Sequence, residues 1–210
     1  MAIPIFAHIA AGSYLIPAVA AYTCRKRLER PMKYFALFIG YTLLHIAGEF
    51  LLGRLGIHNQ FLLNIYRLVF LECILFLYGL WTDRKIFKDI FHLTGLAYLL
   101  FWCIDVAFTP FPAEFRESIS VASNLILIVA SLMILNAANK HSHRRVTEHA
   151  VFWMASGIVL YSSGTMAVTL MSNTILAMGL EYFNAMWHIN WGFTIIANLF
   201  FTKAFLCKIY

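Results

Sequence analysis

Seven apolar stretches, each long enough to cross a lipid bilayer, divide this chain of 210 residues. A transmembrane helix needs about 20 mostly apolar residues, and the short connections leave little chain for anything else. With 61% hydrophobic and 12% charged residues, the composition lies outside the range of soluble domains. The sequence therefore predicts an all-α membrane bundle that forms one domain over residues 1–210. The expected spans cover residues 4–22, 34–53, 61–81, 90–109, 118–138, 150–171 and 184–207.

Positive charge alternates between the connections and predicts the orientation of the bundle. Thirteen of the 16 Lys and Arg residues flank every second connection or the C-terminal tail, whereas Arg54 and Arg116 lie in the connections between them. Lys and Arg near span ends are retained on the cytoplasmic side, so we expect the N-terminus outside and the C-terminus inside. This orientation signal accounts for most of the positive charge. The lipid bilayer is therefore an expected partner, and nucleic acid is not.

Ionisable and amide side chains within the spans are expensive in lipid, so each is a candidate functional group. His45 and Glu49 are four residues apart and Asn64 and Arg67 three apart, which places each pair on one helix face. Glu72, five residues beyond Arg67, faces a different neighbour. With the predicted orientation, most of these groups lie in the outer half of the bilayer. They predict an outward-facing polar chamber with the ligand-binding residues His45, Glu49, Asn64, Arg67, Glu72, Asp105, Asn124, Tyr161, Asn184, His188 and Trp191.

Glu49 and Arg67 are expected to set the charge of this chamber, and His45 and His188 its response to pH. A purely structural alternative stays open. In it, Glu49 and Arg67 form a buried ion pair between adjacent antiparallel helices, and the amides hydrogen-bond between helices. Such contacts hold membrane bundles together with about 0.6 to 2 kcal/mol each.

Two other classes of function also stay open. A small-solute transporter or channel is one, because charged residues also line substrate paths. A metal-dependent intramembrane hydrolase is the other, and it needs at least three converging ligands. His8, His45, Glu49 and His188 would supply them if the first, second and seventh helices are neighbours. No predicted span carries the pair of His residues four apart that is typical of zinc on a helix, as in zinc hydrolases of the ceramidase and adiponectin-receptor type. The residues identify no cofactor.

Three segments in the third, sixth and seventh spans carry a further signal. They are Asn64-Ile65-Tyr66 with Glu72, HAVFWMASGIVLYSSGT at 149–165 and WHINWGFTIIANLFFTKAFLC at 187–207. These segments resemble a family of small seven-helix bacterial membrane proteins, which occur alone or as the membrane module ahead of sensor histidine kinases. The matching positions are Asn64, Glu72, Trp153, Gly157, Tyr161, Gly164, Trp187 and Asn198.

The resemblance implies a sensory or signal-transmitting protein of the bacterial inner membrane, with its basic inner loops available to a cytoplasmic partner. His45, Glu49 and Arg67 have no counterpart in the family's pattern. The leading hypothesis is therefore a receptor-like module without catalytic activity. It would bind a small or lipidic ligand in the outer chamber and signal to the cytoplasm.

Overall fold

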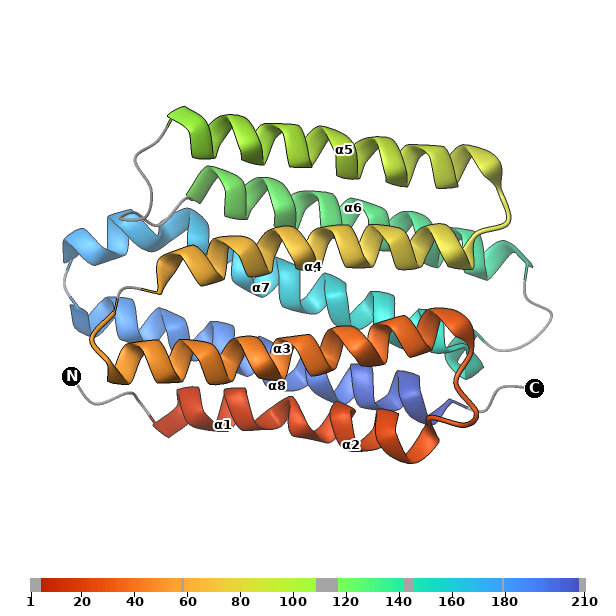
Figure 1. Ribbon diagram of the computed structural model, residues 1–210, viewed down its shortest axis with the longest axis horizontal. Coiled ribbons are helices and arrows are strands. Elements are labelled where there is room, and N and C mark those ends of the chain that lie inside the picture. The colour runs from red at the N-terminus through yellow and green to blue at the C-terminus, as the bar shows by residue number, and fades with distance from the viewer. Residues whose placement is uncertain (1–4, 58, 109–116, 142–145, 179, 208–210) are drawn as a thin grey trace.

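A computed structural model describes residues 5–57, 59–108, 117–141, 146–178 and 180–207, which form helices joined by short connections (Figure 1). Seven of the described helical segments are long and apolar enough to cross a membrane, as expected of a multi-pass membrane protein. The helices are α1 (Ile5–Ser13), α2 (Leu15–Cys24), α3 (Arg30–Arg54), α4 (Gln60–Trp81), α5 (Lys85–Phe108), α6 (Glu117–His141), the short 3₁₀ helix η1 (Val146–Glu148), α7 (Ala150–Met178) and α8 (Leu180–Leu206). The prediction of an all-α bundle with seven spans is confirmed.

α1 and α2 together make the first span, and the helix is interrupted at Tyr14. Pro17 causes this break, because it has no N–H for the carbonyl of Ser13 and its ring crowds that carbonyl. The Tyr14 N–H bonds to the Ala11 carbonyl at 3.4 Å, which is the tighter three-residue turn. The second span also differs slightly from its predicted range. α3 begins at Arg30, with a proline in its first turn where the missing N–H leaves no hydrogen bond unmade.

The seven spans form a closed ring. The first span packs against both α3 and α8, and α8 continues the ring to α7 and α6. On the other side, α4 contacts α3, α5 and α6, and in Figure 1 the α3–α4–α5 row lies in front of α8, α7 and α6. Half of the most apolar stretch of α4 is buried, against 17% of that of α5. α4 is therefore the more enclosed of these two helices, and α5 the more exposed.

The connections separate into two ends of the bundle. The α2–α3 and α4–α5 connections lie together with the C-terminal end of α8, while the start of α1 and the α3–α4 connection lie at the opposite end (Figure 1). We call the first of these the basic end, because Arg25, Lys26, Arg27 and Arg84 lie there. The half of the bundle away from it is called the far half.

Aromatic rings fill the core toward the basic end. Phe35 is fully buried, with its ring centroid 5.2 Å from that of Phe201 and 5.4 Å from that of Phe205. Phe38 stacks on Phe70 with a centroid distance of 5.3 Å. These contacts join α3 to α4 and α8 across the interior of the ring.

Two glycines of α7 allow it to pack closely on α8. A Cβ atom added to Gly157 would lie 2.7 Å from the ring of Phe201, and one added to Gly164 would overlap the ring of Phe193. Small residues on one stripe let neighbouring helices approach closely.

Candidate ligand-binding site

Arg67 on α4 lines a cavity in the far half of the bundle. Its side chain is 9% exposed. The cavity has a volume of about 60 Å³, and a water molecule needs only about 10 to 15 Å³ of such space. It therefore has room for a few waters or one small polar ligand. Its walls come from α4, α6, α7 and α8, with the polar side chains Tyr66, Arg67, Ser123, Asn124, Tyr161, Thr165, Trp187 and Asn190.

Hydrogen bonds between and within helices hold these walls in place. Thr165 Oγ1 donates to Asn190 Oδ1 at 2.9 Å, which links α7 to α8. Asn124 Nδ2 donates to the Ser120 carbonyl at 2.8 Å, within α6. With its oxygen already accepting from Thr165, Asn190 has its amide N–H groups left as donors. The ring of Tyr161 meets Phe70 edge to face, with centroids 5.6 Å apart, where the cavity borders the aromatic core.

A histidine–carboxylate pair lies beside this cavity on α3. His45 Nε2 is 3.4 Å from Glu49 Oε1, and the Glu49 side chain is 32% exposed. The buried His45 ring stacks on Tyr66, with centroids 4.4 Å apart. Glu49 is near enough to Arg67 for their charges to attract. Glu49, which the structural alternative pairs with Arg67, therefore also contacts His45.

The structure separates the predicted site residues into groups. Arg67, Asn124 and Tyr161 line the cavity, and His45 and Glu49 lie behind its Tyr66 wall. On α4, Asn64 is buried one turn before Arg67, and its Oδ1 has no hydrogen-bond partner among the described residues. The side chain of Asn184 lies outside the described residues.

The remaining predicted residues lie elsewhere in the bundle. Glu72 faces Gly95 of α5, in agreement with its predicted orientation toward a different neighbour from that of Arg67. Asp105 is half-buried on α5, which does not border the cavity. His188 and Trp191 form an aromatic group with their rings 5.0 Å apart, on the side of α8 that faces α1.

The four residues of the proposed metal site do not converge. Within the described ranges, no group of three or more His, Cys, Asp or Glu side chains is placed to hold a metal ion. The helices are neighbours as the hydrolase hypothesis requires, but their side chains diverge. His8 stacks on Phe50 at 5.2 Å between centroids and His188 stacks on Phe6 at 5.7 Å, while His45 pairs with Glu49.

Five polar residues of the cavity were not predicted from the sequence, namely Tyr66, Ser123, Thr165, Trp187 and Asn190. On α8, Trp187, Asn190 and Thr194 follow one another three and four residues apart, next to the stripe that contains His188 and Trp191. α8 is polar on both faces because it packs between two helices. Asn198 on the other face donates to Ser13 of α1 at 2.7 Å. The spacing of three and four residues on α8 could have identified Trp187 and Asn190. The same spacing also fits the stripe of His188 and Trp191 on the other face.

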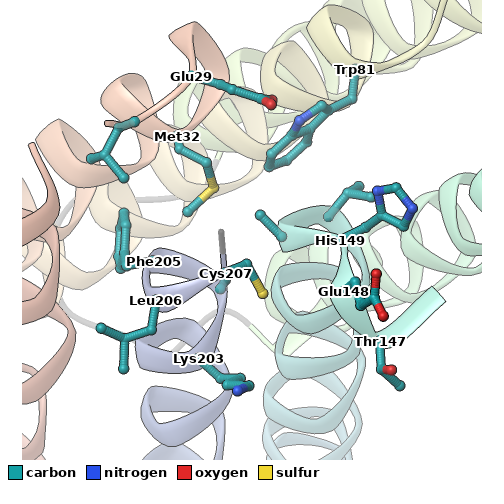
Figure 2. A pocket seen from close by; sticks show the side chains of 14 residues that line it. Glu29, Met32, Trp81, Thr147, Glu148, His149, Lys203, Phe205, Leu206 and Cys207 are labelled. Atoms are coloured by element: carbon teal, nitrogen blue, oxygen red, sulfur yellow. The ribbon is translucent and has the colours of Figure 1, made fainter. Parts of the chain in front are cut away.

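A second and larger cavity opens at the basic end. It has a volume of about 680 Å³ and lies between the ends of α3, α4, α7 and α8 (Figure 2). Its apolar walls include Met32 and Phe205, and Trp81 and Glu29 lie across from Lys203 and Glu148 (Figure 2). Burial raises the pKa of the Cys207 thiol at its edge, against the opposite influence of Lys203.

Comparison with models of protein families, with curated proteins and with solved structures found no match for this chain. Two features of the molecule itself bear on function. One is a buried cation on a polar cavity in the far half, and the other is an open cavity at the basic end. α4, α7 and α8 line both.

Proposed function

We propose that this protein is a receptor-like module of the bacterial inner membrane, with its N-terminus outside and its basic end in the cytoplasm. It binds a small anionic ligand, free or as the headgroup of a lipid, in the cavity at Arg67. It transmits binding to a cytoplasmic partner at the basic end. The alternating charge of the connections supports the orientation, and the resemblance of three segments to sensor modules supports the signalling role.

The single observation that carries this proposal is the buried guanidinium of Arg67 on an internal cavity. A cation within a membrane bundle is costly unless it faces a partner, a water-filled space or a ligand. Around it, the Asn190 amide and the Tyr161 hydroxyl provide further hydrogen-bond donors, whereas the Ser123 hydroxyl already donates to the Ser120 carbonyl. A guanidinium with neutral donors suits a carboxylate or phosphate group.

Helices that line both cavities provide a route for the signal. Tyr161 and Thr165 on α7 border the cavity at Arg67, and Ala150 and Val151 at the start of the same helix border the cavity at the basic end. A small shift of α7 or α8 on ligand binding would therefore change the shape of the basic end. Close packing supports such rigid-body movement, because well-packed helices move as units.

The structure favours binding over transport. Between the two cavities, the interior is occupied by buried side chains, including Phe38, Phe70, Leu71, Ile74 and Phe201. A transported solute would have to pass this apolar core. The diverging orientations of His8, His45 and His188 give the hydrolase alternative no ligand set among the described residues.

Thermal unfolding of the purified protein in the presence of defined anions tests the proposal. The probes are formate, acetate, phosphate and sulfate, together with vesicles of anionic or zwitterionic phospholipid. Binding of a ligand at 100 times its Kd stabilises the folded state by about 2.7 kcal/mol. We expect at least one anionic probe to raise the melting temperature of the wild type, and this increase to disappear in Arg67→Gln.

Arg54→Gln is the matched control, because Arg54 lies exposed at the end of α3 in the same half of the bundle. It should respond to the anion as the wild type does. An equal increase in Arg67→Gln, or no response of the wild type to any anion, would rule out the proposed ligand site.

A further inference from the structure

Glu72 occupies a position that the proposed ligand site does not use. It lies near the middle of α4, and its side chain faces α5 instead of the cavity. A Cβ atom on Gly95 would lie only 2.6 Å from Glu72 Oε2, so the carboxyl group fits against the α5 backbone at a point without a side chain. Glu72 is half-buried, and the seam between α4 and α5 thus holds its carboxyl group at mid-span.

This carboxyl group has no polar partner among the described residues. Its Oε1 atom is buried without a hydrogen bond, and it forms no ion pair within the described part of the chain. The titratable groups along the seam are His92, Tyr98 and Asp105 on α5, while Arg67 on α4 points to the cavity. Tyr98 interacts electrostatically with Arg67 as well as with Glu72 and Asp105.

Such surroundings favour the protonated form of a carboxyl group. An ionised carboxylate taken out of water needs a cation or several hydrogen-bond donors, whereas a neutral acid loses much less on transfer. We propose that Glu72 is a proton-binding site, which holds its proton at neutral pH within the seam between α4 and α5.

The position of the site links the proton to helix movement. α4 carries both Glu72 and the cavity residue Arg67, and α5 is the least enclosed of the spans. A displacement of α4 relative to α5 would admit water to the carboxyl group and release the proton. The protonation of Glu72 itself does not depend on the proposed anion site, so each proposal can fail without the other.

Infrared difference spectroscopy of the protein in lipid vesicles tests the protonation directly. Subtracting the spectrum of Glu72→Gln from that of the wild type at neutral pH should leave the C=O stretching band of a protonated carboxylic acid. Glu29→Gln, which removes an exposed glutamate at the basic end, supplies the reference spectrum of a glutamate in water. If Glu72→Gln instead removes the two stretching bands of a carboxylate, the proposal is overturned.

Chemical labelling of the wild type gives a second test, which does not depend on the folding of any variant. Dicyclohexylcarbodiimide enters lipid and reacts with protonated carboxyl groups. The acid proton moves to a carbodiimide nitrogen as the carboxyl oxygen bonds to the central carbon, and the acyl group then migrates to nitrogen without loss of any atom. We expect peptide mass spectrometry to find the adduct on Glu72 in the wild type. An unmodified Glu72 after prolonged exposure would overturn the proposal.

Two glycines of the seam test where the carboxyl group lies. Gly95→Ala places a methyl group at the carboxyl oxygen and should displace it, which shifts the carboxylic acid band. Gly79→Ala on the same seam would meet His92 at an ordinary 3.7 Å and should leave the band unchanged. Identical spectra for both variants would contradict a carboxyl group enclosed against Gly95.

Discussion

The two halves of the bundle have different interiors although the same helices build them. Toward the basic end, Phe35, Phe201 and Phe205 pack ring against ring before the helices open around a cavity of about 680 Å³. In the far half, hydroxyl, amide and guanidinium groups surround a cavity of about 60 Å³. The aromatic interior is what packing alone requires. The polar interior is not, because apolar side chains would hold helices together as well as these groups do.

Stability and binding reside in different halves of this fold. Large apolar side chains in a close-packed core contribute several kcal/mol each, of the order of 2 to 5 for complete truncation. Hydrogen bonds between transmembrane helices contribute about 0.6 kcal/mol on average. Substitutions in the aromatic half should therefore weaken the fold, whereas substitutions in the polar half should mainly weaken ligand binding.

Phe35→Ala should have the largest effect on stability. It removes a fully buried ring from the contact between α3 and α8 and should lower the free energy of unfolding by about 3 to 5 kcal/mol. Leu37→Ala on the same helix is the matched control, because that side chain is 71% exposed and should cost far less. The measurement is the unfolding midpoint in mixed micelles with increasing sodium dodecyl sulfate. Equal losses in both variants would contradict an aromatic core between these helices.

Gly157→Ala should have an intermediate effect. The added methyl group would meet the ring of Phe201 and separate α7 from α8, at a cost of about 1 to 3 kcal/mol. At Gly40 of α3 the same change meets nothing within 4 Å, so Gly40→Ala should be neutral or slightly stabilising. The same denaturation assay distinguishes the two. A neutral Gly157→Ala would mean that the α7–α8 packing is looser than described.

Thr165→Val should have the smallest effect on stability. It removes the hydrogen bond to Asn190 without changing the volume of the side chain and should cost less than about 1.5 kcal/mol. Because it alters the wall of the cavity, it should still reduce the anion-induced increase in melting temperature. A loss of stability as large as that of Phe35→Ala would favour a structural role for the polar half and remove the contrast between the two halves.

The spans and their number were predictable because the bilayer imposes a local requirement. A helix must stay apolar for about 20 residues, whatever its neighbours are. The ends were less predictable, because α3 and α8 continue beyond the apolar stretch, to Arg30 and Leu180. Their extra turns include the charged residues Arg30, Lys33 and Glu181, so the apolar pattern of a span does not predict them.

The sequence predicted how deep in the bilayer the site residues lie, but only partly which neighbouring helix each of them faces. Arg67, Asn124 and Tyr161 were identified because a polar group within a span is rare enough to be informative. His188 was assigned to the chamber although it faces α1, and Asn190 on the adjacent face was missed. The stripe of Trp187 and Asn190 is offset by one residue from that of His188 and Trp191, which is a rotation of about 100° around α8. Neighbouring helices set that rotation, and a helix that is polar on two faces does not reveal it.

The most direct test of the ligand site is a cryo-electron microscopy map of the wild type and of Arg67→Gln, both in lipid nanodiscs with the anion that gives the largest thermal shift. We predict density for the anion in the cavity, in contact with the Arg67 guanidinium and the Asn190 amide, and its loss in the variant. A map in which Arg67 forms an ion pair with Glu49, and in which the cavity holds only water or side chains, would contradict the ligand site and leave the polar half a structural network.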